Sequence, residues 1–245
     1  PVKVENADIG AISAGDAFSL YLKSNVWGGF NLRGVGENQF GQLGDGSTTD
    51  RNSSIFIDDN VTAVSAGGNY SFWLLSNGTL RAVGRNFSGQ LGDQTRQDRS
   101  SPVNVVGGTN VTAIAAGHDH SLFIKNDNSL WGMGRNSEGQ LGDGTTNDQD
   151  TSVQIDVNVT AVTAGFNHTL YIKTDGSLWA MGRNQYGQLG DGTTQDRISS
   201  VKVVASGVSA VSSSSSADHS FFIKTDGSLW AMGHNHKGQL GDGTT

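Results

Sequence analysis

Three histidines are the residues of this chain whose types and spacing could bind a metal ion. His120, His168 and His219 hold the same place in three copies of a repeated segment, and imidazole nitrogens are common zinc ligands. Tyr70 and Phe18 hold that place in the other two copies. A position that accepts phenylalanine is a packing position, and repeats arranged around a ring would keep the imidazoles apart. We therefore expect these side chains in the core and expect no metal site.

A second set of groups with ligand chemistry consists of aspartates in a loop that recurs as Gly-Asp-Gly-Thr-Thr or a close variant. They are Asp45, Asp93, Asp143, Asp191 and Asp242. In four copies another aspartate follows five residues later, as Asp148 follows Asp143. Oxygen-rich loops suit calcium, but the spacing of an EF-hand loop is absent. An aspartate that hydrogen-bonds within its own turn explains the pattern without an ion, so we expect no cofactor.

No combination of residues singles out an active site. No set of Ser, His and Asp stands apart from the repeats, and the Gly-x-Gly segment at positions 34–36 lacks the following helix that phosphate binding needs. Trp131, Trp179 and Trp230 share one position in the repeat, which favours packing. We therefore predict that the protein is not an enzyme.

Composition narrows the range of partners. The 245 residues include 16 Lys and Arg and 23 Asp and Glu, so the net charge of -7 repels nucleic acid. There are no cysteines and no apolar run long enough to cross a bilayer. The chain starts at Pro1 without the pattern of a signal peptide, which favours a mature, extracellular form. We expect a protein partner, no nucleic acid and no membrane span.

The segment Gly-Gln-Leu-Gly-Asp occurs five times and defines the repeat. Its copies start at Gly41, Gly89, Gly139, Gly187 and Gly238, with spacings of 48, 50, 48 and 51 residues. A fixed period of this length indicates one supersecondary unit per repeat. Short β-branched or alternating runs, interrupted by glycine, precede each copy. They are typical of strands, and no stretch has the period of a helix.

The fourth copy shows the predicted strands most clearly. They are Val159–Thr163, His168–Lys173, Leu178–Met181 and the outermost strand Val201–Val204. Asp175-Gly176 predicts a type I′ turn between the second and third strands. Four short antiparallel strands per repeat are typical of a β-propeller blade. A β-sandwich is the alternative for a β chain of this length, but it does not predict the same loop in every repeat.

The repeats resemble those of the regulator-of-chromosome-condensation family over essentially the whole chain. The matching segments are Ala116–Leu122, Ala164–Leu170 and the five Gly-Gln-Leu-Gly-Asp loops. The resemblance implies an all-β propeller and makes residues 1–245 a single repeat domain. The best-known members of the family have seven blades, so five repeats form either a smaller ring or part of a larger one.

The ends of the chain predict how a ring of five blades would close. Pro1–Val4 resembles the outer strand Val201–Val204, and the fifth repeat reaches Thr245 before such a strand. Pairing the two ends would protect a sheet edge that otherwise favours aggregation. We predict five four-stranded blades in a ring closed by the N-terminal strand.

Function is expected on the loops, because the repeats differ most in the two residues before each Gly-Gln-Leu-Gly-Asp segment. The first repeat also replaces its tight hairpin with a longer segment. The candidate binding residues are Phe40, Phe87, Glu138, Tyr186, Lys237, Trp27 and Phe30. Variable, partly aromatic loops on a rigid scaffold suit protein recognition. We predict a non-catalytic binding scaffold that recognises a protein or surface polymer through loops on one face of the propeller.

Two other functions stay open. The resemblance implies, through the family's namesake, a guanine-nucleotide exchange factor for a small GTPase, although the acidic charge and the lack of a basic tail weigh against it. A carbohydrate-binding propeller is the other alternative, because rings of equivalent aromatic and Asp or Asn groups suit sugars.

Overall fold

The computed structural model describes residues 3–5 and 8–245, whose regular structure consists of nineteen strands in five antiparallel sheets. Within this part of the chain there is no helix that could span a bilayer. Each sheet is built from strands that follow one another in the sequence. The predicted all-β repeat architecture is therefore confirmed.

The strands of each sheet have the following bounds. The first sheet contains β1 (Ile9–Ala14), β2 (Phe18–Ser24), β3 (Phe30–Gly36) and β4 (Arg51–Asp58). The second contains β5 (Val61–Ala66), β6 (Tyr70–Leu75), β7 (Leu80–Gly84) and β8 (Arg99–Asn104). The third contains β9 (Val111–Ala116), β10 (His120–Lys125), β11 (Leu130–Gly134) and β12 (Gln149–Asp156). The fourth contains β13 (Val159–Ala164), β14 (His168–Lys173), β15 (Leu178–Gly182) and β16 (Arg197–Val204). The fifth contains β17 (Val208–Ser212), β18 (His219–Lys224) and β19 (Leu229–Gly233).

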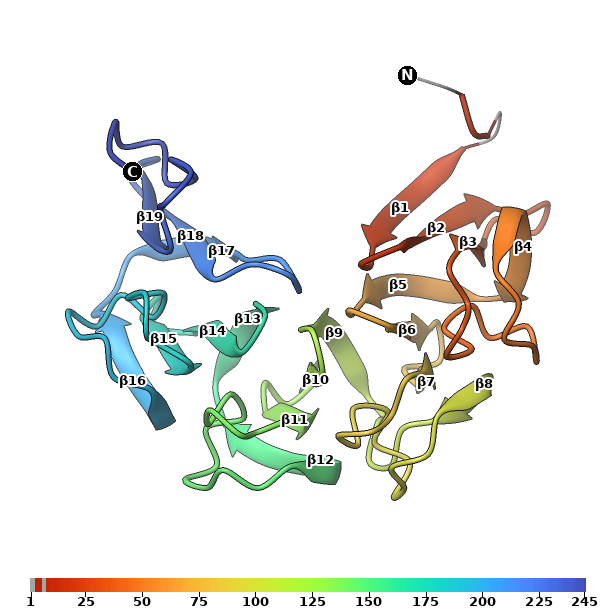
Figure 1. The fold of residues 1–245 in the computed structure, drawn as a ribbon, viewed down its shortest axis with the longest axis horizontal. Coiled ribbons are helices and arrows are strands. Elements are labelled where there is room, and N and C mark those ends of the chain that lie inside the picture. Colours follow the sequence, from red (N-terminus) through yellow and green to blue (C-terminus); the bar gives the residue numbers. More distant parts are fainter. Residues whose placement is uncertain (1–2, 6–7) are drawn as a thin grey trace.

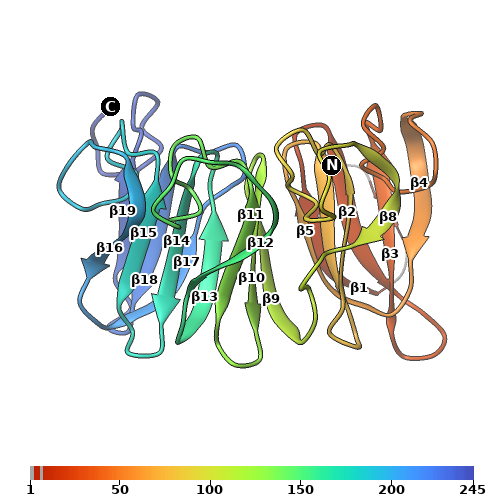
Figure 2. The same ribbon diagram turned by 90° about the horizontal axis from the view of Figure 1, so that it is seen from below.

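The five sheets are the blades of a propeller, arranged around a common centre (Figure 1). The first strand of each blade lies innermost, and in the first four blades the fourth strand lies at the perimeter. The long loops between third and fourth strands gather at one edge, which we call the loop face. The tight turns between second and third strands gather at the opposite edge, which we call the turn face (Figure 2).

The turn at Asp175-Gly176 differs from the predicted type I′ turn. Gly176 donates its amide to the carbonyl of Lys173 at 2.9 Å, so Thr174 and Asp175 are the central residues of the turn. Neither has a positive φ, whereas Gly176 has a φ of 74°. The turn therefore has the conformation of a three-residue hairpin loop in which glycine alone is left-handed.

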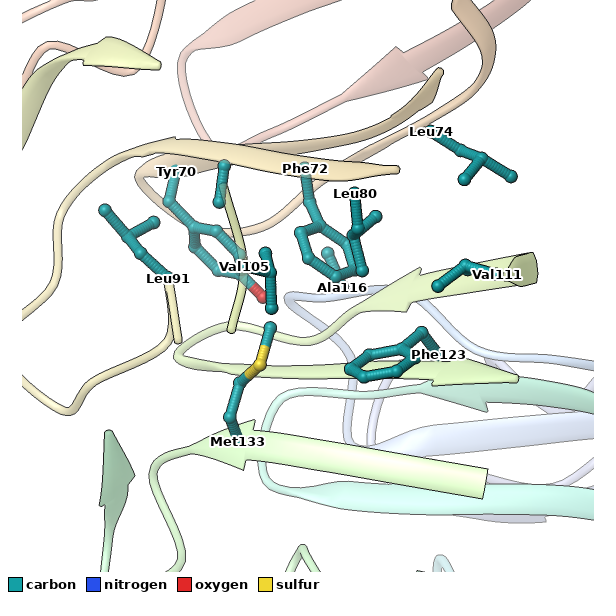
Figure 3. Packing of buried hydrophobic residues seen from close by; sticks show 11 residues of the cluster. Tyr70, Phe72, Leu74, Leu80, Leu91, Val105, Val111, Ala116, Phe123 and Met133 are labelled. Atoms are coloured by element: carbon teal, nitrogen blue, oxygen red, sulfur yellow. The ribbon is translucent and has the colours of Figure 1, made fainter. Parts of the chain in front are cut away.

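Each inner blade is buried on both sides because it packs between two neighbours. We call the side that meets the next blade in sequence the forward face and the opposite side the backward face. In the second blade, Tyr70, Phe72 and Leu80 lie on the forward face, and they pack against Phe123 and Met133 on the backward face of the third blade (Figure 3). Alternation along the strands supplies one set of apolar side chains to each face.

The ring does not close in the predicted way. Among the described residues the fifth sheet has three strands rather than four. Lys3–Glu5 belongs to no strand, and Glu5 pairs with Lys23 of the first blade at 3.0 Å, which holds this segment beside β2. Pro1 and Val2 of the predicted closing strand lie outside the described residues. An open sector separates the first blade from the fifth (Figure 1).

The two end blades nevertheless meet at the centre of the propeller. Ser216 Oγ in the loop before β18 donates a hydrogen bond to Asp16 Oδ1 in the loop after β1, at 2.6 Å. Asp16 also lies 3.2 Å from His118 Nε2, and His118 Nδ1 lies 3.0 Å from Asp119. The hydrogen bond to Asp119, together with the charge of Asp16, raises the pKa of His118 above its ordinary value. The inner loops of the first, third and fifth blades are thus tied together.

A matched pair of substitutions tests the claim that contact between blades stabilises the sheets. Leu178 and Leu229 start the third strands of the fourth and fifth blades, but Leu178 is fully buried and Leu229 is 65% exposed. We expect Leu178→Ala to lower the free energy of unfolding by about 2–5 kcal/mol. We expect Leu229→Ala to lower it by less than about 1 kcal/mol. Equal losses in denaturant unfolding would contradict this account.

Candidate functional site

Each long loop on the loop face is held by an asparagine at the same position of the repeat. Its side-chain oxygen accepts the amide of the loop leucine, at 2.9 Å for Asn38 and Leu43 and at 3.0 Å for Asn184 and Leu189. The side-chain amide of Asn184 donates to Asp191 Oδ1 at 3.0 Å. Asn38 and Asn184 are fully buried. The loops are therefore fixed from within, and their outer residues sit on a rigid support.

The loop aspartates complete this support. Asp191 Oδ1 accepts the amide and the hydroxyl of Thr193 at 2.9 and 2.7 Å, and Oδ2 accepts Arg197 Nε at 2.7 Å. Burial alone would raise the pKa of Asp191, but these hydrogen bonds outweigh it and lower the pKa to about 2. Donors of the same loop and of the first residue of β16 thus engage both oxygens, as expected for an aspartate that stabilises its own turn. Within residues 3–5 and 8–245, no group of three or more His, Asp or Glu side chains is placed to hold a metal ion.

The repeat position of His120 and His168, which the sequence predicts to be a packing position, lies between neighbouring blades. His120 and His168 are fully buried. His120 Nε2 lies 3.0 Å from Thr169 Oγ1 of the next blade, and His168 Nε2 lies 2.7 Å from Ser220 Oγ. Burial lowers the pKa of His120 to about 4 and that of His168 to about 3. Both imidazoles are therefore neutral at pH 7 and join one blade to the next.

The candidate binding residues are divided between the two faces. Phe40, Phe87, Glu138 and Tyr186 belong to the loops between third and fourth strands, and Lys237 belongs to the equivalent segment after β19, so all five lie on the loop face. Phe87 is 73% exposed and Tyr186 is 43% exposed, whereas Phe40 and Glu138 are half-buried.

The other two candidates do not belong to the loop face. Trp27 lies in the turn between β2 and β3, on the turn face, and is 91% exposed. Phe30 starts β3 and joins the core, with its ring so close to Gly10 that a Cβ there would lie 2.5 Å away. The longer hairpin of the first blade thus creates a separate feature on the opposite side of the propeller.

The loop face also contains cationic and aromatic stacks that the sequence analysis missed. The guanidinium of Arg85 lies over the Phe40 ring at 5.6 Å, and that of Arg183 lies over the Tyr186 ring at 5.4 Å. Tyr186 stacks in turn on His234, with ring centroids 4.2 Å apart. The sequence contained a signal for these groups. The tripeptide Gly-Arg-Asn precedes the two variable loop residues in three repeats, and Gly-His-Asn takes its place at His234. These groups extend the candidate surface across neighbouring blades.

Comparison with known proteins identifies the family. A family model of the RCC1-like domain matches residues 1–245. The chain belongs to the RCC1-like domain family. This confirms the resemblance to the regulator-of-chromosome-condensation repeats. No curated protein sequence matches the chain.

Solved structures of RCC1-like propellers have the same fold at low sequence identity. Human WBSCR16 is 22% identical with a TM-score of 0.81, and the match covers 96% of this chain and 64% of that one. Prp20p from Saccharomyces cerevisiae is 18% identical with a TM-score of 0.69, over 97% of this chain and 74% of that one. Yeast RCC1 (Prp20) bound to Kap60 is 18% identical with a TM-score of 0.64, over 92% and 70%. At these identities the likeness shows the fold alone.

The buried histidines predict how stability depends on pH. A histidine of the unfolded chain titrates near pH 6.5. Below that pH the unfolded chain binds protons that folded His120 and His168 take up only near pH 4 and pH 3. The free energy of unfolding therefore falls as pH decreases from 6.5, by up to about 1.4 kcal/mol per pH unit for each histidine.

The variant His168→Phe isolates one of these histidines, because Phe18 fills the same position in the first blade. We expect the variant to change the free energy of unfolding by less than about 1.5 kcal/mol at pH 7. Between pH 7 and pH 4.5 the free energy of unfolding of the variant should rise by about 2 kcal/mol relative to that of the parent, because the variant lacks the buried imidazole that makes the parent less stable in acid. Denaturant unfolding at the two pH values measures this, and an unchanged pH slope would contradict the assignment.

Proposed function

We propose that this RCC1-like propeller is a non-catalytic binding module that docks a protein partner on the loop face. The observation that supports this most directly is the combination of exposed aromatic rings with stacked cationic groups on braced loops. Phe87 and Tyr186 offer apolar surface, and Arg183 and His234 flank Tyr186. Aromatic and arginine side chains are enriched among residues that dominate protein interfaces.

Rigidity of the loops favours tight binding by this surface. Docking costs conformational entropy when exposed side chains and loops become ordered. The buried Asn184 and the doubly engaged Asp191 already fix the loop that presents Tyr186. A partner would then meet a surface that needs little ordering.

The arginines of the loop face lie next to carboxylates. Arg85, Arg135 and Arg183 occupy the same position in three neighbouring blades and are partly exposed. Arg85 and Arg183 lie 3.8 and 3.9 Å from Asp119 and Asp218, and Arg135 lies 3.4 Å from Glu138, so all three charges are partly balanced. Such a mixed surface favours a protein partner over a strongly anionic polymer.

Relatives with this fold are consistent with protein binding. The yeast relative Prp20p was studied for its binding to Gsp1p and histones, and yeast RCC1 was solved with Kap60 bound. These partners belong to those proteins. They support a protein-binding role for this chain without naming its partner.

Affinity capture with face-specific variants tests the proposal. We expect the parent chain to retain a macromolecule from native extract, and the double variant Phe87→Ala/Tyr186→Ala to retain it at least about tenfold less, because both rings leave the loop face. Trp27→Ala on the turn face is the matched control and should bind as the parent does. Failure of micromolar bait to retain anything, or equal loss in both variants, would contradict the proposal.

A second candidate function, carbohydrate binding, is favoured by the turn face of the first blade. Trp27 lies beside a shallow cleft of about 530 Å³ that Phe56, Asn31, Asp59 and Asn60 also line. The side chain of Asn25 fixes the turn by accepting the amides of Trp27 and Gly29, each at 3.0 Å. An exposed indole beside amide and carboxylate groups offers both a stacking surface and hydrogen bonds to a sugar.

A glycan array separates the two functions. If the turn face binds sugars, Trp27→Ala should abolish glycan binding because the stacking surface is lost, and Phe87→Ala/Tyr186→Ala should leave it unchanged. Glycan binding that survives Trp27→Ala would rule out this site, and an empty array would leave protein docking as the supported function.

A further inference from the structure

The long loops of the loop face carry most of the net charge of the chain. Residues 37–50, 85–98, 135–148 and 183–196, between third and fourth strands, contain ten Asp and Glu side chains and four Arg side chains. They therefore contribute -6 to the net charge of -7. A partner that docks on this face meets an acidic surface, and attraction between opposite charges steers association and selects partners.

An arginine at the start of the fourth strand offsets part of this charge in three blades, where it pairs with the aspartate of its own loop. The pairs are Arg51 with Asp45, Arg99 with Asp93 and Arg197 with Asp191. In the third blade Gln149 takes the place of the arginine and only donates a hydrogen bond to Asp143, at 3.1 Å. The next residue, Asp150, adds a negative charge where the other blades have uncharged residues. These are Asn52, Ser100 and Ile198. The start of β12 is therefore the point at which the repeat pattern changes toward negative charge.

Phe87, the most exposed aromatic residue of the described loop face, belongs to the loop that packs on this point. Its side chain is 73% exposed. A Cβ on Gly89, two residues further on, would lie 2.6 Å from Asp150 Cα. The amide of Gln94 donates to the carbonyl of Asp150 at 3.0 Å. The loop thus places the exposed ring beside the acidic start of β12. The other repeats have no phenylalanine at this position, where they have Gln39, Ser137, Gln185 and His236.

Three carboxylates at this junction have oxygens to spare. Asp98 and Asp148 each use Oδ1 to accept an amide of their own loop, both at 2.7 Å, and their Oδ2 atoms accept no hydrogen bond from the described residues. Asp150 makes no side-chain hydrogen bond or ion pair within the described part of the chain. Arg96 is the nearby cation, and it donates to the backbone carbonyl of Asp148 at 3.1 Å instead of to a carboxylate. The junction is therefore short of cations.

Two other aromatic rings of the loop face show which groups such rings attract. The guanidinium of Arg85 lies over Phe40, and that of Arg183 lies over Tyr186. A cation over the face of an aromatic ring is attracted by the quadrupole of the ring. Among the described residues, no cationic group lies over Phe87. Phe87 thus offers to a partner the place that an arginine of the chain occupies at Phe40 and Tyr186.

We propose that the junction of the second and third blades, formed by Phe87, Asp98, Asp148 and Asp150, binds a basic segment of the protein partner. One lysine or arginine of that segment lies over Phe87, and the carboxylates bind its neighbouring cations. This inference rests on the proposed docking of a protein on the loop face and adds the chemistry of the docking segment. A metal ion does not suit the junction, because within residues 3–5 and 8–245 no group of three or more carboxylate or imidazole side chains is placed to hold one.

Two substitutions return the third blade to the pattern of the repeat and remove its excess negative charge. Gln149→Arg restores the arginine that the second blade has at Arg99, and Asp150→Ser introduces the residue that the second blade has at Ser100. Because both residues occur at these positions in another blade of the same fold, the double variant should fold.

A control variant changes the net charge equally on the opposite side of the propeller. Asp127 and Asp175 lie in the turns between second and third strands, on the turn face. The second blade has Asn77 at this position, where its side-chain oxygen accepts the amide of Thr79 as Asp127 accepts that of Ser129. Asp127→Asn/Asp175→Asn should therefore keep both turns intact.

Titration with a fluorescent peptide of alternating lysine and glycine, followed by anisotropy at low salt, tests the proposal. We expect Gln149→Arg/Asp150→Ser to weaken binding of the peptide at least about tenfold. Phe87→Gln should weaken it at least about threefold because the ring is lost. The turn-face control should change it less than about twofold. Raising the ionic strength from about 20 to about 200 mM should weaken binding by the parent chain.

Three results would overturn the proposal. The first is equal weakening by the two double variants, because the peptide would then respond to the net charge of the whole chain. The second is failure of the lysine peptide to bind the parent at low salt. The third is equal binding of a peptide of alternating glutamate and glycine.

Affinity capture from native extract separates this inference from the proposed function. If Gln149→Arg/Asp150→Ser retains the captured protein as well as the parent does, the loop face docks a protein but not through a basic segment, and the inference is wrong. If the parent retains nothing, the proposed function fails, and the peptide titration still decides for or against the junction.

Discussion

Each blade of this propeller depends on the blade that follows it, because a four-stranded sheet with two apolar faces cannot bury both alone. Phe72 and Leu80 need Phe123 and Met133 of the next blade, and the loop at Gly41 needs the outer strand at Ser100. That loop approaches so closely that it requires glycine, whose φ there is 80°. Stability is therefore shared between neighbours, as in other repeat proteins.

The same loops make the propeller suited to recognition. Asn184 fixes the amide of Leu189 within its loop, and the Leu189 side chain packs into the core that the fourth blade shares with the fifth. The side chains of the two variable residues take no part in this hydrogen bond or in this core, so the sequence varies there while the backbone stays braced. Arg183, Tyr186 and His234 show the result, since side chains of two adjacent blades stack into one surface. The candidate binding surface thus follows from the way in which the blades are joined.

The sequence predicted those features that depend on local pattern. Strand β14 has the predicted bounds, and the position of His168 is a buried packing position, because alternation and tolerance of Phe or Tyr are visible in the repeats. The turn at Gly176 was assigned to the wrong type, since both conformations place glycine in the left-handed region.

Features that depend on contact between distant parts were missed. Closure of the ring depends on the angle between successive blades, and the packing of whole blade faces determines that angle. The resemblance of Pro1–Val4 to an outer strand contains no information on it. Trp27 lies on the turn face because its turn and the long loop adjoin opposite ends of β3. Predicting this position required the topology of the strands. The stack of Arg183 on Tyr186 required the loop conformation.

Native-state hydrogen exchange of the whole chain tests most directly the claim that contact between blades stabilises the sheets. Strands β10 and β14 lie in blades covered on both sides, whereas β18 lies in a blade whose forward face is exposed. The account predicts that amides of β10 and β14 exchange at least about tenfold more slowly than those of β18. Equal protection of the three strands would show that each blade is stable by itself, and would contradict the account.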